Sequence, residues 1–576
     1  MKLQDRFFYR WAAVVVAAMV VGCAPTKEQP TSAQDCAGPH LEKRGDVTQL
    51  IVNSQPWLML GCELGNSTSS SKAYMDPYWD KLQASGVNTV LAAVTWEQTE
   101  PEEGCYDFTV VDDLLAGARE HDMKLVLLWF GSWKNGITSY DPVWVKEDTE
   151  RFPLAETVDG KRLPILSTLG KESCEADARA FAAMMRHLKA CDAQQQTVVM
   201  VQMENEVGLH GYPRDYSPLA NKAFGEQVPL QLIGYLQEHK ESLLPETLMA
   251  WQESGCRTEG TWEEVFGANE RAAELFMAWH YAAYMEHISA VGKKEYDLPI
   301  FVNAWIVQPE DSHPGNYPSG GPQAQNHDIW RAAAPHIDML CPDIYLNDFP
   351  EILTLYSRSG NPVFIPESRA GQNGAANAAY AIGQGQAMGY SPFGFESSCD
   401  TEANRTFCEL YRSLAAIADK VLAAQASGTI GAAWLKGSDP MRVKDDIVLG
   451  GTRITCELVS SGMRNGGAPQ LTGGTYNPND MGYVIAIQEE DTLLFLGSNA
   501  RVTFKPAEGE GITGLARVVE GDFDEEGSWR AGRWLNGDQI QLRYDLLYAV
   551  QEGYSGQGLN FQMPHPQFIK VQLFNY

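Results

Sequence analysis

The feature that most constrains this chain is an alternation of short β-rich runs with helix-like segments between about residue 50 and residue 425. Eight such runs can be counted: Leu58–Glu63, Thr89–Trp96, Leu125–Phe130, Val198–Glu204, Pro299–Trp305, Asp338–Tyr345, Pro362–Glu367 and Gly389–Glu396. Several are continuous apolar stretches, which suits parallel strands buried on both faces. The pattern predicts an α/β fold, a closed (β/α)8 TIM barrel over residues 46–425, with an open doubly wound sheet as the alternative.

The spacers between these runs carry the matching helical pattern. Pro77–Ser85 is a candidate helix ended by a glycine, Val111–Glu120 places its apolar residues on one face, and Ala176–Leu188 is also amphipathic. The connection between the fourth and fifth runs is unusually long, with helical segments near Leu230–Glu238 and Arg271–Val291. We expect this connection to be an elaborated loop that caps the site.

After residue 425 the sequence changes to β-rich segments separated by turn signals. Tyr483–Gln488 and Thr492–Leu496 flank an acidic turn, and Trp534–Asp538 contains the Asn-Gly pair of a tight turn. Further strand candidates are Arg501–Lys505, Leu515–Val519, Gln539–Tyr544 and Phe568–Phe574. We expect a β-sandwich accessory domain over residues 426–576, without a catalytic constellation of its own.

The N-terminus has the pattern of an export signal. Three basic residues precede the apolar run Trp11–Val21, which is too short to span a bilayer but suits a signal peptide. The sequence Val-Val-Gly-Cys that ends at Cys23 resembles the lipobox of bacterial lipoproteins, whose cysteine is acylated after cleavage. This resemblance predicts a signal peptide over residues 1–22, lipidation of Cys23, a tether over residues 23–45 and a lipid-anchored place in the bacterial cell envelope. An ordinary buried cysteine is the alternative.

Charge and motif content argue against several classes of protein. The 576 residues carry a formal net charge of −30, whereas phosphate binding requires a basic surface, so nucleic acid is not an expected partner. The chain has no Cys-x-x-Cys pair, no suitably spaced His pair beside a carboxylate and no Gly-rich nucleotide loop. We therefore expect no metal and no cofactor. Export would permit disulfides among the ten cysteines other than Cys23.

Two carboxylates follow apolar runs at the places where a barrel carries its chemistry. Catalytic groups of such barrels lie at the C-terminal ends of strands. The fourth run leads into Glu204 and Glu206, and the seventh ends at Glu367. Glycoside hydrolysis needs one protonated carboxylic acid for the leaving oxygen and one ionised carboxylate. Glu206 and Glu367 are the candidate pair, and Glu204 is an alternative acid.

The same motifs resemble those of retaining barrel glycosidases, in which Asn-Glu after the fourth strand carries the acid/base and Glu after the seventh is the nucleophile. Gln202–Gly208 is similar to the motif of family 35 β-galactosidases, and Trp96–Phe108 resembles a segment shared by families 35 and 42. The resemblance implies that Glu206 is the acid/base and Glu367 the nucleophile. It also implies that Asn205 binds the sugar 2-hydroxyl.

The resemblance further implies a retaining, exo-acting β-galactosidase that removes terminal β-D-galactosyl residues from oligo- or polysaccharides. Such barrels also form oligomers. Tyr345, which ends the sixth run, is expected to donate a hydrogen bond to the nucleophile; a place in the core is the alternative. Aromatic platforms stack on the apolar face of a sugar, and the candidates at strand ends are led by Trp96 and Trp305. Trp133 is a further platform, and Glu97 is a candidate ligand for sugar hydroxyls.

One departure from the family 35 pattern affects substrate choice. Those enzymes carry Cys-Ala-Glu-Trp after the third strand, and here Phe130–Trp133 takes that place, without the glutamate that contacts galactose. A β-glucoside or α-L-arabinopyranoside specificity is therefore the alternative. A noncatalytic glycan-binding lipoprotein is the rival from another class, although both carboxylates are present. An esterase or zinc protease would need a Gly-x-Ser-x-Gly or His-Glu-x-x-His motif, and the sequence has neither.

Overall fold

The computed structural model describes residues 38–310, 312–459, 476–524, 527–542, 546–562 and 565–576. The predicted signal peptide, the lipidation site Cys23 and most of the predicted tether lie outside these residues. None of the helices within the described ranges combines the length and apolarity that a bilayer crossing requires.

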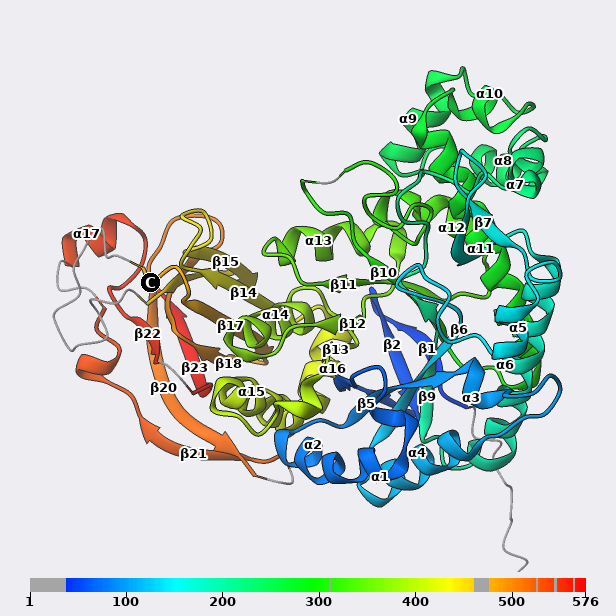
Figure 1. The fold of residues 1–576 in the computed structure, drawn as a ribbon. Helices are drawn as coiled ribbons and strands as arrows, with labels where there is room; N and C mark the ends of the chain where they lie inside the picture. Colours follow the sequence, from blue (N-terminus) through cyan, green and yellow to red (C-terminus); the bar gives the residue numbers. More distant parts are fainter. Residues whose placement is uncertain (1–37, 311, 460–475, 525–526, 543–545, 563–564) are drawn as a thin grey trace, which may run out of the picture. The chain divides into compact units, whose positions relative to one another are not determined.

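Eight parallel strands in the described part of the chain close into a barrel, encircled by helices in Figure 1. The strands are β4 (Met59–Glu63), β5 (Thr89–Thr95), β6 (Lys124–Lys134), β9 (Val198–Asn205), β10 (Ile300–Trp305), β11 (Met339–Ile344), β12 (Ile365–Ser368) and β13 (Gly389–Pro392). They follow one another around the barrel in chain order, and β13 pairs with β4 to close it. The predicted TIM barrel is confirmed. Every one of the eight predicted runs contributes a strand, because its apolar residues are buried on both faces.

Helices connect consecutive strands and cover the outside of the barrel. They are α1 (Lys72–Met75), α2 (Trp79–Ser85), α3 (Trp96–Thr99), α4 (Thr109–Glu120), α5 (Val143–Glu147), α6 (Lys171–Asp192), α12 (His327–Ala333), α13 (Phe349–Tyr356), α14 (Gly371–Gly383), α15 (Arg405–Ala416) and α16 (Ala418–Ser427). As predicted, α2 ends at a glycine, Gly86, whose φ of 91° is left-handed. The apolar face of α4 is buried through Val111, Leu114 and Leu115.

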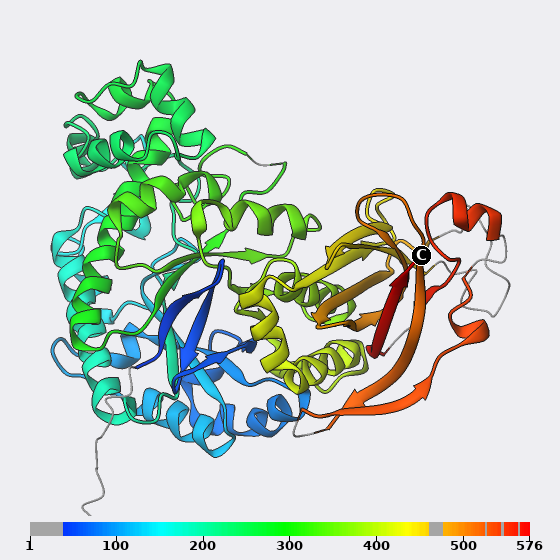
Figure 2. The same ribbon diagram turned by 180° about the vertical axis from the view of Figure 1, so that it is seen from behind.

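The long connection between β9 and β10 is helical, as its sequence predicts. It contains α7 (Pro218–Phe224), α8 (Leu230–Glu238), α9 (Pro245–Glu253), α10 (Trp262–Phe266) and α11 (Glu270–Glu295). The first four gather into one group of short helices in both views (Figures 1 and 2). The fifth packs along α6 on the barrel wall.

A small antiparallel sheet precedes the barrel, formed by β1 (His40–Arg44), β2 (Val47–Val52) and β3 (Gln55–Trp57). Its buried Leu50 and Val52 share a cluster with barrel residues such as Met59 and Met339, at the starts of their strands. The sheet therefore closes the N-terminal end of the barrel, opposite the strand ends that carry the candidate site. This corrects the sequence prediction for residues 40–44, which belong to a paired strand and not to a tether.

After the barrel, the described residues form two antiparallel sheets, coloured yellow to red in Figure 1. One contains β14 (Ile430–Lys436), β17 (Met481–Glu489), β18 (Thr492–Ser498), β23 (Gln567–Asn575), β20 (Thr513–Phe523) and β21 (Trp529–Trp534). The other contains β15 (Lys444–Leu449), β16 (Thr452–Leu458), β19 (Ala500–Pro506) and β22 (Gly558–Phe561). Apolar residues of both sheets share one core, as the predicted β-sandwich requires.

Two details of this region differ from the sequence prediction. The described part of Gln539–Tyr544 forms no strand, apart from a single bridge between Gln541 and Gln557. The Asn-Gly pair does not close a hairpin, because Gly537, with a φ of 56°, begins a 3-10 turn over Gly537–Gln539; the next described helix is α17 (Leu546–Gln551). The cysteines in the described ranges are all free thiols, so the disulfides that export would permit are not formed among them.

Candidate active site

Glu206 and Glu367 lie at the C-terminal mouth of the barrel. Glu206 directly follows β9, and Glu367 is the third residue of the short strand β12. Each side chain is nearly buried, with 7% of its surface exposed. Carboxylate oxygens of Glu206, Glu367 and Asp343 lie within 4.8 Å of one another. The two carboxylates predicted from the chain order of their strands are therefore brought together, and a third from the end of β11 joins them.

Backbone conformation at the end of β9 decides which glutamate faces this cluster. Glu204 and Glu206 have φ values of 56° and 47°, in the left-handed region that residues other than glycine rarely adopt. The Glu206 amide donates to Oδ1 of Asn303 at 3.0 Å, which holds the turned backbone against β10. Such conformations persist only where the surrounding structure imposes them, and they concentrate at functional sites.

Glu204, the alternative acid, lies away from this cluster and supports the backbone. Its carboxylate accepts hydrogen bonds from the amides of Gly131, Ser132 and Trp133 at 2.8–3.1 Å. Burial and then the charge of Asp177 raise the pKa of Glu204 well above its ordinary value. Because both oxygens are engaged by the end of β6, Glu204 positions that strand and cannot also reach a glycosidic oxygen.

The environment of Glu367 favours its ionised form relative to its neighbours. The Tyr345 hydroxyl donates to Oε1 of Glu367 at 2.6 Å, which is the contact expected from the sequence. Burial raises the pKa of Glu367, while the hydrogen bond from Tyr345 and the charge of Lys134 oppose that rise. Burial and then the charge of Glu367 raise the pKa of Glu63 well above its ordinary value. Glu63 is thus the neutral member of the pair.

Glu206 has the opposite tendency and holds a proton near neutral pH. Burial, first, and the charge of Glu367, second, raise the pKa of Glu206 to about 7. Asp343, whose own pKa is raised well above its ordinary value by burial and by Glu367, adds a second neutral acid to the cluster. When their environments push the pKa values of two neighbouring carboxyl groups apart, the group with the higher pKa suits a proton donor and the other suits an anion.

Amide side chains connect these groups across three strands. The Asn205 amide nitrogen donates to Oδ1 of Asn135 at 3.0 Å, while its oxygen accepts from Asn303 at 3.1 Å and from Gln202 at 3.2 Å. Asn303 also donates to Asp343 at 2.7 Å. This network fixes the orientation of Asn205, which is fully buried, next to Glu206 in the chain.

The other predicted contact residues are not all at the mouth. Trp96 is buried and its indole N–H donates to Glu100 at 2.8 Å, and buried Trp133 donates to the Leu166 carbonyl at 3.1 Å. Both tryptophans are held in the core, so their predicted role as sugar platforms is wrong. Trp305, at the end of β10, is 36% exposed and packs edge to face on His210. Glu97, a half-buried residue of α3, lies 3.5 Å from the ammonium of Lys146 and outside the carboxylate cluster.

Sequence reasoning missed the cation of this site. Lys134, the last residue of β6, is nearly buried, and its ammonium donates to Asn135 at 2.6 Å. Its charge lowers the pKa values of Glu63, Glu206 and Glu367. The available signal was a lysine that ends a long apolar strand, as Glu63 ends β4. The carboxylates of Glu206, Asp343 and Glu367 form an all-oxygen set that suits a hard cation, and Lys134 already supplies positive charge beside them.

A separate cavity of about 1050 Å³ lies beside the mouth. Met249 and Glu253 of α9 line one part of it, and Tyr317 and Val307 of the segment after β10 line another. Leu346, the residue after Tyr345, also lines it. The elaborated connection therefore contributes a wall to a cavity next to the site.

Two family models match the chain. Residues 69–265 match glycoside hydrolase family 42, described as β-galactosidase. Over these residues the chain is similar to that family. This match is consistent with the predicted enzyme class, a glycoside hydrolase of the β-galactosidase type. The family 42 segment includes β9 with Asn205 and Glu206, and it ends before β12 and Glu367. Residues 407–546 match a domain of unknown function, DUF5597.

Solved structures resemble the chain at low identity. A β-galactosidase from the psychrophilic Marinomonas ef1 is 13% identical, with a TM-score of 0.43 over 64% of this chain and 62% of that one. A β-galactosidase from Bacillus circulans sp. alkalophilus is 16% identical, with a TM-score of 0.42 over 64% and 57%. The catalytic domain of a β-amylase from Paenibacillus polymyxa is 12% identical, with a TM-score of 0.44 over 62% and 98%. The chain thus spans about three fifths of the length of the two β-galactosidases. A comparison with curated proteins gives no match.

Proposed function

We propose that this protein is a retaining, exo-acting glycoside hydrolase that removes terminal β-D-galactosyl residues from oligo- or polysaccharides. The observation that carries the proposal is the pair of nearly buried carboxylates at one barrel mouth, Glu206 and Glu367, with oxygens within 4.8 Å of each other. The family 42 segment, which contains Glu206, supports the substrate class.

In the proposed reaction each carboxylate does what its environment favours. Protonated Glu206 gives its proton to the glycosidic oxygen, while ionised Glu367 attacks the anomeric carbon and forms a glycosyl ester. The Glu206 carboxylate then takes a proton from water, which attacks the same carbon and releases Glu367. Tyr345 holds the nucleophile in place through its hydrogen bond of 2.6 Å. Asn205 binds the 2-hydroxyl.

The separation of the two carboxylates supports retention of configuration. Retaining enzymes have carboxyl groups roughly 5–5.5 Å apart, whereas inverting enzymes need roughly 6.5–9.5 Å to fit a water molecule. Oxygens of Glu206 and Glu367 that approach within 4.8 Å leave little room for that water. The exposed Trp305 is the remaining sugar platform, and the cavity beside Leu346 has room for the rest of a glycan.

The first test is turnover of nitrophenyl glycosides by a soluble form that lacks the first 23 residues. We expect β-galactoside hydrolysis that Glu367→Gln abolishes and that Glu206→Gln partly spares, because nitrophenol leaves without protonation. Azide needs no general base, so it should restore turnover of Glu206→Ala and give a β-galactosyl azide. Glu102→Gln, at an exposed acid, is the matched control.

Other outcomes of the same panel have definite meanings. Faster hydrolysis of β-glucosides or α-L-arabinopyranosides would change the proposed sugar specificity but not the proposed mechanism. If the folded wild type hydrolysed none of the glycosides, the proposed enzymatic function would be wrong, and a noncatalytic glycan-binding function would be favoured. Inverted product, read by NMR, would contradict the double displacement.

We also propose that the protein is anchored by a lipid on Cys23 in a bacterial cell envelope. The basic residues, the apolar run Trp11–Val21 and the lipobox-like Val-Val-Gly-Cys support this location. Full-length protein expressed in a Gram-negative host should fractionate with membranes, and Cys23→Ser should release it. Mass spectrometry of the N-terminal peptide should show acyl chains. An unmodified N-terminus in the membrane-free fraction would contradict the anchor.

A further inference from the structure

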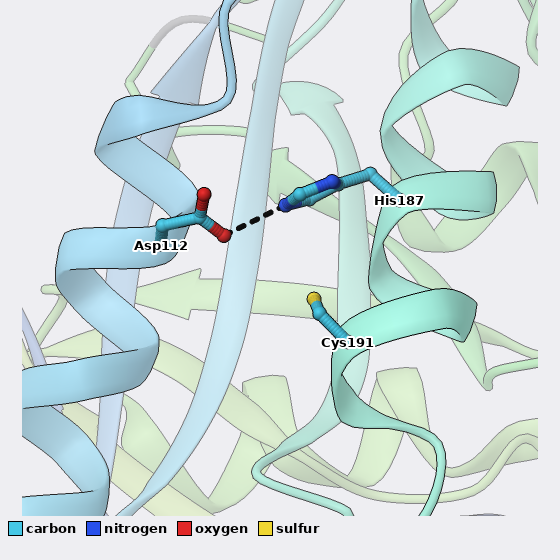
Figure 3. A group of neighbouring side chains, drawn as sticks. All are labelled: Asp112, His187 and Cys191. Carbon is cyan, nitrogen blue, oxygen red and sulfur yellow. Dashed lines mark hydrogen bonds and ion pairs between the residues drawn. The ribbon is translucent and has the colours of Figure 1, made fainter.

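A second group of ligand-type side chains lies on the outside of the barrel, between α4 and α6. It consists of Asp112, His187 and Cys191, and Figure 3 shows all three directed into the same gap between the two helices. One ligand atom from each side chain lies within 4.8 Å of the other two. The His187 Nε2 and the Asp112 Oδ1 are 2.7 Å apart. The proposed hydrolytic site uses none of these residues.

The spacing along the helices explains why these side chains meet. His187 and Cys191 are four residues apart in α6, so they project from the same face one turn apart. Asp112 lies in the first turn of α4 and reaches across to them. Two ligands at i and i+4 on one helix with a third from a neighbour is a spacing that metal sites use.

The surroundings hold this arrangement in place. The Phe108 ring stacks on the His187 imidazole with centroids 4.4 Å apart and an interplanar angle of 14°. This stacking fixes the plane of the imidazole and directs Nε2 at Asp112. Arg119 of α4 donates to the Cys191 carbonyl at 3.1 Å and to Asp192 at 2.7 Å, which ties the two helices together beside the thiol. The geometry is therefore set by packing as well as by the Asp112–His187 contact.

We propose that Asp112, His187 and Cys191 bind a Zn²⁺ ion, with water as the fourth ligand. A mixed set of nitrogen, sulfur and oxygen donors suits zinc, whereas Mg²⁺ and Ca²⁺ prefer oxygen alone. Bond lengths of about 2.0–2.3 Å place tetrahedral ligand atoms roughly 3.3–3.7 Å apart. The present atoms, between 2.7 and 4.8 Å apart, reach that geometry by small side-chain rotations. The metal displaces the thiol proton and the proton shared by Asp112 and His187.

The proposed ion would be structural. It would join α4 and α6, which cover the barrel wall at β5 and β6, and it would leave the carboxylate cluster at the mouth unchanged. Binding to the folded protein alone raises stability by mass action. With zinc at about 100 times its dissociation constant, the Tm should rise by about 2 °C, while galactoside turnover should not depend on zinc.

The test uses protein that has been stripped with a chelator and dialysed. Calorimetric titration with Zn²⁺ should give one equivalent bound, and Co²⁺ should give a sulfur-to-metal charge-transfer band in the near ultraviolet. His187→Ala and Cys191→Ser should each remove the band and weaken zinc binding at least tenfold. The band identifies the thiol site, because the carboxylates at the barrel mouth hold no sulfur.

Two variants control for general effects. Cys105→Ser removes an exposed thiol, and His336→Ala removes a histidine that pairs with Glu286 at 2.6 Å without a cysteine. Both should bind zinc like the wild type. No uptake by the wild type, or equal uptake by Cys191→Ser and His187→Ala in folded form, would overturn the site and leave an ordinary ion pair beside a free thiol.

Discussion

At the scale of single residues, the chemistry of the mouth depends on burial acting unequally on similar groups. Glu206 and Glu367 have the same side chain and the same exposure. The charge of Glu367 adds to burial in raising the pKa of Glu206, whereas Tyr345 hydrogen bonding works against burial at Glu367. The difference separates a proton donor from an anion, as the proposed reaction requires.

The pH dependence of kcat/KM follows from these shifts. Glu206 must carry a proton, so activity should fall as the pH rises through about 7. Glu367 must be ionised, so activity should also fall as the pH drops through its pKa, which burial places above the ordinary value. The two limbs belong to the coupled pair. A bell-shaped profile is expected on a β-galactosyl disaccharide, whose sugar leaving group needs protonation, and an activity that still rises above about pH 8 would contradict the assignment.

Tyr345→Phe should lower kcat/KM by about 10- to 100-fold, since a hydrogen bond to a charged group contributes about 1.5–3 kcal/mol. The acid limb should move to higher pH, because loss of the donor raises the pKa of Glu367. Tyr483→Phe is the matched control: this buried hydroxyl on β17 has no hydrogen-bond partner in the described residues. Unchanged kinetics in Tyr345→Phe would show that the 2.6 Å contact is only structural.

At the scale of elements, the end of β9 controls which glutamate faces the carboxylate cluster at the barrel mouth. Residues two apart in a regular strand share a face, so Glu204 and Glu206 are equivalent in the sequence pattern. Left-handed backbone at both positions separates them. Glu204 turns to the end of β6, whose last residue is Lys134, and Glu206 turns to Glu367.

Glu204→Gln should destabilise the fold without changing the chemistry. Three backbone amides need both carboxylate oxygens, and a glutamine would direct N–H groups at one of these donors. We expect a loss of about 2–4 kcal/mol in the free energy of unfolding, measured by urea denaturation, with the alkaline limb retained. If folded Glu204→Gln lost the alkaline limb of its kcat/KM profile, Glu204 would instead be identified as the acid. Glu102→Gln should change neither quantity.

At the scale of the whole molecule, the barrel and the first C-terminal sheet share one hydrophobic core. Helix α14 packs against β14 and β17, and buried Trp434 of β14 donates to Asn377 of α14 at 2.9 Å. From the same strand, Lys436 donates to the carbonyl of Asn347, two residues beyond Tyr345. The C-terminal sheets therefore support the loop that carries Tyr345, the residue that donates to the proposed nucleophile Glu367.

Trp434→Ala should cost about 3–5 kcal/mol in the free energy of unfolding, because it leaves a cavity between α14 and β14 and an unpaired Asn377. Trp434→Phe keeps most of the packing and should cost less. Thermal unfolding of both variants checks this order. An unchanged Tm for the alanine variant would show that the sheets unfold independently of the barrel.

The sequence by itself determined the eight barrel strands and the positions of Glu206 and Glu367 along them. Parallel strands buried on both faces require continuous apolar runs, and the polar residues that end such runs lie at the barrel mouth. The apolar runs and the polar residues that end them are local features of the sequence, so the sequence pattern predicts them. The same local logic failed at Trp96 and Trp133, because a strand end does not reveal whether a side chain turns outward or into the core.

Only the tertiary structure decided what meets across the chain. Closure of the barrel brings Asp343, Lys134 and Glu63 to Glu206 and Glu367 and thereby sets their protonation states, which depend on distance and on exclusion of water. Side-chain contact between α4 and α6 likewise joins Asp112 to His187 over 75 residues of sequence and brings both to Cys191. Electrostatic coupling and sets of metal ligands depend on distances in space between residues that are far apart in sequence, so a local sequence pattern does not predict them.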